Sequence, residues 1–340
     1  MTSELKLIFE LCKERKDIPY VDLSNLSEDL FFKLLVENQV LFPVLKNLEK
    51  IFNANLNPLL DKIRTSLQND YLINADEKMK WLLDFLENLK VESMLHKYQY
   101  YQREQSDIDI LIPLEKEITV IEQLKKEDFF PIAKEHFKTA MSKNIKNSKF
   151  TIHVHSKIKW ESEFIPTNDV WKNSKIIKIF EHSIHIPSIE DSILIECVHS
   201  IFENRTVRIC DLLQFLELTK NQIDWNSVIT RLVKYKLSAV GYLYFFAINQ
   251  LANDFLQLNP IDQKILESLK KNISLDEKVF SINPETKEIL FKFKQKAPIK
   301  LKLSSSAFLF VSYNRKFGIR RFFWSIGVIL SAALKHLHSP

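Results

Sequence analysis

Glycine is almost absent from this chain, and its distribution limits the folds that the sequence can adopt. Three glycines occur among 340 residues, Gly241, Gly318 and Gly327, and none lies in the first two thirds of the chain. A loop whose backbone N–H groups close around a phosphate needs glycine, because side chains would obstruct the approach. Rossmann-type and P-loop folds, which depend on such loops, are therefore excluded.

Apolar side chains recur at three- and four-residue steps along most of the chain, which is the spacing of amphipathic helices. Residues 58–89 follow this spacing, so we predict one long helix or two stacked helices there. After Pro187 the pattern resumes and continues toward the C-terminus, and Ser188 and Asp191 stand at the spacing of a capping box. A hydrophobic content of 46% supplies enough apolar side chains for a large core.

Strand-type signals occur only between residues 75 and 160. Three short runs have strand character, at 91–95, 106–113 and 149–160. A helix is expected over 115–126, followed by a loop over 126–149. We therefore predict an α+β fold that is mostly helical, in which a small sheet with flanking helices lies between N-terminal and C-terminal helical regions.

The same pattern divides the chain into three parts, 1–74, 75–187 and 188–340. No Ser/Gly-rich or strongly charged linker separates them, so they are expected to pack together. The apolar run 322–334 is too short to span a bilayer, and a docked C-terminal helix is favoured over a membrane-surface segment. No transmembrane segment is expected.

Cysteine and charge content indicate the setting. Cys12, Cys197 and Cys210 are far apart and form no C-x-x-C pair, so neither a disulfide framework nor a zinc site is predicted. The N-terminal segment is charged throughout and lacks the apolar stretch of a signal peptide, which favours a cytoplasmic location. The formal net charge of +5 is spread along the chain, so there is no clear signal for a nucleic-acid partner.

Two carboxylates stand one residue apart in the run "SDIDILIP" at 106–113. Side chains alternate across a strand, so Asp107 and Asp109 point to one face while the neighbouring isoleucines point to the other. Two adjacent anions repel unless a cation, a helix N-terminus or solvent screens them. The residues alone leave two alternatives open, a solvated strand edge and a metal site.

Histidines accompany the later strand signal. His153 and His155 share one face of the run 149–160, where they could face solvent or belong to a site. His199 is favoured as a hydrogen-bonded core residue, because the residues three and four positions before it are Glu196 and Ile195 rather than a metal-binding set.

The order of these features resembles the nucleotidyltransferase fold related to DNA polymerase β, and within it the group called uncharacterised nucleotidyltransferases. Members typically read R-x-x-x-D-I-D-L-L-V, and the matching positions here are Arg103, Asp107, Ile108, Asp109, Ile110, Leu111 and Ile112. Farther along, the group has an acidic residue, one apolar residue and a histidine, and His153 and His155 occupy the first and last of these places. Its following helical motifs resemble the residues Glu190, Asp191, Leu194, Cys197, His199, Asp211, Asp224 and Trp225.

The resemblance implies roles for several residues. Asp107 and Asp109 would hold Mg²⁺ ions that bridge the phosphates of a nucleoside triphosphate, with ATP as the favoured nucleotide. His153 would stand in the catalytic place of the third carboxylate and as the third metal ligand. Lys97 would bind the nucleotide, as would Arg103, which could instead pair with Asp107.

Two departures from the family pattern concern the phosphate and metal sites. The family usually has a glycine step and a helix after its first strand, whereas here only five residues separate Lys97 from Arg103 and none is glycine. An imidazole at His153 removes one negative charge and suits Mn²⁺ better than Mg²⁺. Weak nucleotide binding and a shift toward Mn²⁺ are therefore expected.

Two functions from different classes follow. The favoured one is a divalent-metal-dependent nucleotidyltransferase that moves a nucleoside monophosphate from a nucleoside triphosphate to a small-molecule or peptide acceptor, in the biosynthesis of a specialised metabolite (natural product) or a modified peptide. The alternative is a catalytically degenerate relative that binds a peptide, a metabolite or a partner enzyme of the same pathway.

Overall fold

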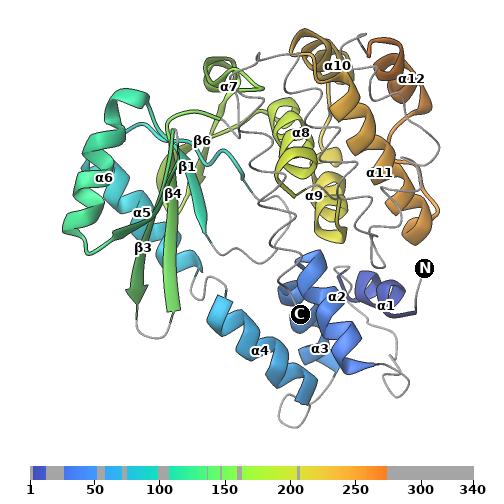
Figure 1. Ribbon diagram of the computed structural model, residues 1–340, viewed down its shortest axis with the longest axis horizontal. Helices are drawn as coiled ribbons and strands as arrows, with labels where there is room; N and C mark the ends of the chain where they lie inside the picture. Colours follow the sequence, from blue (N-terminus) through green and yellow to red (C-terminus); the bar gives the residue numbers. More distant parts are fainter. Residues whose placement is uncertain are drawn as a thin grey trace, which may run out of the picture. The chain divides into compact units, whose positions relative to one another are not determined.

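A computed structural model gives the structure of the chain (Figure 1). It describes residues 3–12, 27–51, 58–70, 75–98, 107–135, 137–145, 148–158, 163–204 and 207–273. Two residues or segments of the sequence predictions, Arg103 and the apolar run 322–334, lie outside the described residues.

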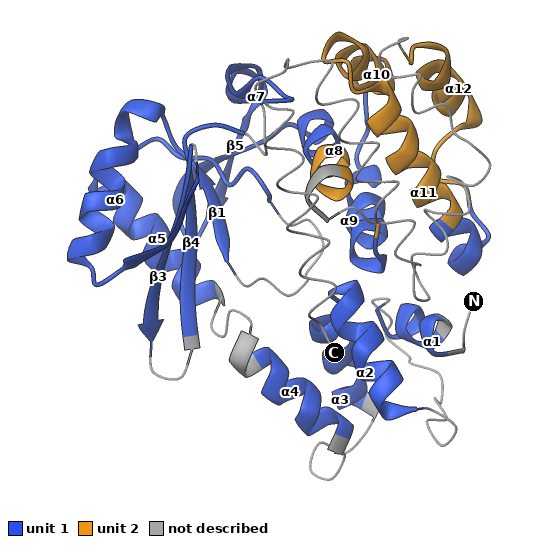
Figure 2. Ribbon diagram, viewed as in Figure 1, with its two compact units in different colours: residues 1–195, 208–224, 251–258 blue, residues 196–207, 225–250, 259–340 orange. Residues whose placement is uncertain are grey.

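The chain divides into two compact units (Figure 2). The first contains residues 1–195, 208–224 and 251–258, and the second contains residues 196–207, 225–250 and 259–340. The three-part division 1–74, 75–187 and 188–340 stays a prediction.

Among the residues that the structure describes, five helices precede the sheet, as the apolar spacing indicates. They are α1 (Ser3–Cys12), α2 (Glu28–Asn38), α3 (Leu41–Ile51), α4 (Pro58–Asp70) and α5 (Ala75–Asn88). The Ser27 hydroxyl caps α2 by accepting a hydrogen bond from the Leu30 N–H at 3.4 Å. Because α4 and α5 are separate helices, the prediction of two helices over 58–89 is the correct alternative.

The main sheet has four strands, β1 (Ile108–Leu111), β2 (Phe130–Glu135), β3 (Lys138–Ile145) and β4 (Ser148–His155). Their order is β1-β4-β3-β2, with β1 parallel to β4 and the other pairs antiparallel. A short 3₁₀ turn (Leu114–Lys116) and helix α6 (Glu117–Lys126) follow β1. The mixed sheet and its flanking helices confirm the predicted α+β class.

The prediction of a loop over 126–149 is wrong, because residues 130–135 and 138–145 pair as the antiparallel strands β2 and β3. Every residue of β2 is exposed, and the register shifts between Pro131 and Ala133. An edge strand with both faces in solvent has no apolar alternation to reveal it. The middle of β3 is buried continuously, at residues 139–142, so it also lacks the period of two.

The strand expected at 91–95 is also wrong, since only Met94 forms bridges. Its N–H and carbonyl pair with Leu111 at 2.9 and 2.8 Å, and it also bridges to His185 of β6. Strand β6 (His182–Ile186) pairs with β5 (Lys175–Ile179) after the short helix α7 (Thr167–Asn173). The sequence does not predict this second sheet, because its strand-type signals end at residue 160.

Helices make up the chain after Pro187, as predicted for the described part. They are α8 (Ile189–Val198), a π-helical stretch (His199–Asn204), α9 (Ile209–Thr219), α10 (Trp225–Lys234), α11 (Ser238–Leu256) and α12 (Gln263–Lys271). The Asp191 N–H donates to the Ser188 hydroxyl at 3.1 Å, which confirms the cap. None of the described helices combines the length and the hydropathy that crossing a membrane requires.

One face of β1 and β4 builds the core of the α/β region. The isoleucines of β1 and the residues Ile152 and Val154 of β4 pack in a buried cluster with side chains of α5 and α6, including Leu86 and Leu124. The period of two then places the remaining side chains of both strands on the opposite face. That opposite face carries the aspartates and the histidines.

Candidate functional site

The parallel register of β1 and β4 brings together residues that are more than 40 positions apart in the sequence. Asp109 is opposite His153, and Leu111 is opposite His155. Because side chains alternate, Asp107 and Asp109 lie on the same face as both histidines. The strands of Asp109 and His153 are therefore neighbours, with these side chains on one face.

The imidazole of His153 lies between the two carboxylates. Its Nδ1 atom is 3.2 Å from Asp107 Oδ2 and 3.3 Å from Asp109 Oδ1. A nitrogen that faces two anionic oxygens carries its proton there, so in neutral His153 the unprotonated nitrogen is Nε2. Nε2 has no hydrogen-bond partner among the described residues, so it can accept a proton or a ligand.

Asp109 is the most heavily contacted member of the cluster. The His155 Nε2 atom lies 2.8 Å from Asp109 Oδ1, and the Lys97 ammonium lies 3.4 Å from Oδ2. Burial raises the pKa of Asp109, but the Lys97 charge and the hydrogen bonds from both histidines outweigh it, so the pKa is well below its ordinary value. Asp109 is therefore an anion that the protein itself neutralises.

Asp107 behaves in the opposite way. Burial, followed by the neighbouring charge of Asp109, raises the pKa of Asp107, and the opposing effects of His153 and Lys97 are smaller. Its side chain keeps 29% exposure, against 9% for Asp109. Of the two carboxylates, Asp107 is the more exposed and the one whose charge its neighbours offset less.

His96 is a member of this cluster that the sequence interpretation missed. Its ring packs edge-on against His155, with centroids 4.4 Å apart, and its Nδ1 atom is buried with no hydrogen-bond partner among the described residues. Burial lowers the pKa of His155 and lowers that of His96 well below the ordinary value, so both rings are neutral. The signal in the sequence that could have identified His96 is its position next to Lys97, which is predicted to bind the nucleotide.

The remaining predicted positions lie elsewhere. Asp211 is buried at the start of α9, where its Oδ2 accepts from the Arg208 N–H at 2.8 Å and acts as a helix cap. His199 is buried in the π-helical stretch of the second unit. Lys97 does lie in the cluster, where it contacts Asp109, and its role at the nucleotide stays a prediction.

The donor set of the cluster fits a divalent cation. Asp107, Asp109 and His153 each offer one ligand atom, and these atoms lie within 4.8 Å of one another. Two carboxylates with one imidazole suit ions such as Mn²⁺ better than Mg²⁺, which prefers oxygen ligands. An ion bound there would replace the proton that His153 Nδ1 directs at the carboxylates.

Comparison with known proteins places this site within a family domain. Residues 96–253 match the family model described as uncharacterised nucleotidyltransferase. Among solved structures, the lincomycin-bound crystal structure of lincosamide antibiotic adenylyltransferase LnuA is similar at 16% identity, covering 44% of this chain and 98% of that chain, with a TM-score of 0.33. No curated protein sequence matches the chain. The segment that holds the paired aspartates and both strand histidines therefore matches the family model that its motifs indicate.

Proposed function

We propose that this domain transfers a nucleoside monophosphate from a nucleoside triphosphate, with ATP as the favoured donor, to a hydroxyl group of a small-molecule acceptor. The observation that carries the proposal is the convergence of Asp107, Asp109 and His153 across the β1–β4 pair. Neighbouring carboxylates on one strand face, completed by a third group from the adjacent strand, are the arrangement that phosphoryl chemistry with divalent ions requires.

The reaction balances as a single displacement. The acceptor oxygen forms a bond to the α-phosphorus, the bond from that phosphorus to the bridging oxygen breaks, and pyrophosphate leaves with the bonding electrons. The acceptor hydroxyl gives up its proton in this step. That proton passes to solvent, because neutral His153 with an ion on Nδ1 would carry its own proton on Nε2.

The other residues of the cluster hold the charges in place. His155 positions Asp109 through its 2.8 Å hydrogen bond, and Lys97 offsets the charge of that carboxylate. Asp107, Asp109 and His153 would hold the divalent ion, with Mn²⁺ preferred over Mg²⁺. When bound, such an ion neutralises negative charge on the phosphate oxygens.

The alternative is a nucleotidyltransferase fold that has become a binding module for a peptide, a metabolite or a partner enzyme. One observation favours it: Lys97 and two histidines already surround Asp109, so its charge is balanced without a metal ion. The two functions differ in whether a metal–nucleotide complex binds at all.

Calorimetry and thermal shift with ATP, GTP, CTP and UTP, each with Mg²⁺ or Mn²⁺, test the proposal. We expect metal-dependent binding with a dissociation constant on the order of 0.1 mM or weaker, equivalent to less than about 6 kcal/mol, because no glycine loop is present to cradle the phosphates. Slow pyrophosphate release, with water as the acceptor, supplies a readout that needs no knowledge of the natural acceptor.

Two variants make the test specific. Asp107→Asn should abolish the metal-dependent shift, whereas Asp76→Asn, which changes an exposed carboxylate in the first turn of α5, should leave it intact. If no nucleotide produces a metal-dependent shift with the wild-type protein, and no pyrophosphate is released, the binding-module alternative is correct.

A further inference from the structure

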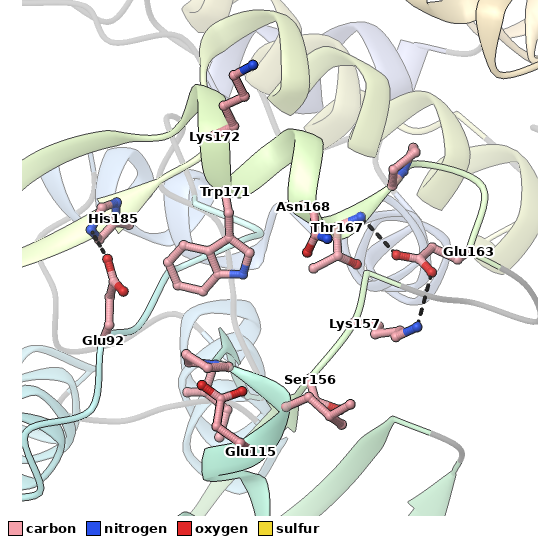
Figure 3. Close-up of a pocket in the computed structure, with 14 residues that line it drawn as sticks. Glu92, Glu115, Ser156, Lys157, Glu163, Thr167, Asn168, Trp171, Lys172 and His185 are labelled. Carbon is pink, nitrogen blue, oxygen red and sulfur yellow. Dashed lines mark hydrogen bonds and ion pairs between the residues drawn. The ribbon is translucent and has the colours of Figure 1, made fainter.

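A cavity of about 940 Å³ opens at the carboxyl ends of β1 and β4 (Figure 3). Residues 112–115, which follow β1, and residues 156–157, which follow β4, form one side of it, and residues of α7 and β6 form the other. All of these residues belong to the first unit. None of them is in the Asp107–Asp109 cluster, so the cavity is a separate feature that the proposed chemistry has not used.

Trp171 supplies a flat apolar surface in this cavity. Its ring projects from α7 into the space between the His185–Glu92 pair and Glu115 (Figure 3). The indole packs edge-on against His185, with centroids 5.5 Å apart. His185 is itself held at both nitrogens, by the Ser174 hydroxyl at 2.8 Å and by Glu92 Oε1 at 3.0 Å. An aromatic ring supported in this way is suited to stacking against a ligand.

Most charges of the cavity are paired within the protein. Glu92 binds His185, and Glu163 binds Lys157 at 3.4 Å and accepts from the Thr167 N–H at 2.9 Å. The charged groups left over are one carboxylate, Glu115, and one ammonium, Lys172, for which the described structure shows no ion pair. Because one acid and one base remain, the cavity does not select a strongly charged ligand.

The polar groups that remain match hydroxyl groups. The Ser156 hydroxyl is in a side chain that is 4% exposed, lines the cavity and has no hydrogen-bond partner among the described residues. A buried hydroxyl without a hydrogen-bond partner is unfavourable, so a ligand atom that forms this hydrogen bond would bind favourably. A ligand hydroxyl can donate to Glu115 and accept from Ser156, because it carries both a donor and an acceptor.

The cavity is close to the proposed chemistry along the chain. Ile112, in the cavity wall, follows Asp109 by three residues, which is about 10 Å along an extended strand. Ser156 directly follows His155, and the segment from Glu92 in the cavity to Lys97 at Asp109 runs beside β1 through the Met94–Leu111 bridge. Three segments therefore extend from the cavity to the carboxylates.

We propose that this cavity binds the acceptor of the nucleotidyl transfer, and that the acceptor is a neutral, hydroxyl-rich small molecule with an apolar ring face, of the glycoside class. Only the role of the ligand as acceptor rests on the proposed function; binding of such a ligand in the cavity does not. The apolar face stacks on Trp171, and the hydroxyls bond to Ser156 and Glu115. One hydroxyl loses its proton as its oxygen bonds to the α-phosphorus and pyrophosphate leaves.

Saturation-transfer NMR with the full chain tests the binding, using phenyl glycosides of several hexoses as probes. Benzylamine and benzoate serve as comparators, because they carry a similar ring with a positive or a negative charge. We expect the glycosides to give the stronger signals. Trp171→Ala should weaken binding about tenfold, since it removes the central aromatic anchor. Phe180→Ala, which removes an exposed aromatic ring outside the cavity, should not change it.

Failure of this inference is distinguishable from failure of the proposed function. Absence of signal from every glycoside, or equal signals from the wild-type protein and Trp171→Ala, overturns the cavity assignment even if nucleotides bind. Stronger signals from benzylamine or benzoate overturn the ligand class. Glycoside binding without any metal-dependent nucleotide binding overturns the acceptor role. Support for that role is glycoside-stimulated pyrophosphate release, with a KM for the glycoside that rises in Trp171→Ala.

Discussion

The same two strands, β1 and β4, carry two polar regions of opposite character. In the Asp107–Asp109 cluster the charged side chains are largely buried and contact one another directly, so that one carboxylate has a lowered pKa and the other a raised pKa. In the cavity beyond the strand ends, the Glu92 and Glu115 side chains are exposed. Burial couples charges, whereas solvent screens them, so changes in the first region should alter stability and chemistry together.

The largest expected effect is on nucleotidyl transfer by the cluster. Asp107→Asn and Asp109→Asn should each reduce pyrophosphate release by about 100-fold or more, because each removes a carboxylate from the proposed metal site. Steady-state release with Mn²⁺ and ATP measures the effect. Full activity in both purified variants would show that the aspartates do not hold the ion.

The two aspartates should differ in stability, although they are two residues apart. Asp109→Asn leaves Lys97 beside a neutral group and should cost roughly 2–4 kcal/mol of unfolding free energy. Asp107→Asn relieves repulsion between the carboxylates and should leave the metal-free protein unchanged or more stable. Urea denaturation in metal-free buffer compares the two variants. Equal destabilisation by both would mean that Asp107 is also a structural partner.

A smaller effect concerns metal preference. His153→Asp should shift the ratio of Mg²⁺ to Mn²⁺ affinity toward Mg²⁺ by about tenfold, because it replaces an imidazole with an oxygen ligand. Calorimetry with each metal and ATP measures the ratio, and His153→Asn serves as an uncharged control. An unchanged ratio would remove His153 from the ligand set.

The pH dependence of stability should separate Asp107 from Asp109. The folded pKa of Asp107 is raised above 3.8, so its ionisation opposes folding, and this cost appears as the pH rises through the window between 3.8 and the folded pKa. The folded pKa of Asp109 is lowered, so its contribution is present above 3.8 and is lost as the pH falls through the folded pKa. In urea denaturation from acidic to neutral pH, the free energy of unfolding of Asp107→Asn should therefore increase relative to that of the wild-type protein as the pH rises. A constant difference would contradict the raised pKa.

The smallest expected effect belongs to the cavity. Glu115→Gln changes an exposed carboxylate and should alter the unfolding free energy by less than about 0.5 kcal/mol, as is usual for surface substitutions. The same variant should still weaken glycoside binding in the NMR experiment. A loss of stability comparable to that of Asp109→Asn would show that the two regions do not differ in the way proposed here.

Local patterns in the sequence are sufficient to predict several features of the structure. The period of two places Asp107 with Asp109 and His153 with His155, whatever the strands pair with. The spacing of Ser188 and Asp191 predicts the start of α8, because a helix cap involves only neighbouring residues. The scarcity of glycine excludes phosphate-binding loops in the same local way.

Tertiary structure decided the features that depend on distant partners. The parallel pairing of β1 with β4 brings His153 to both carboxylates, and the Met94 bridge brings His96 and Lys97 to Asp109. The exposed β2 strand and the cavity around Trp171 likewise exist only through residues far away in the chain. A side chain's periodicity depends on its neighbours in sequence, but its burial, its charge partners and its pKa depend on groups that only the folded chain brings within reach.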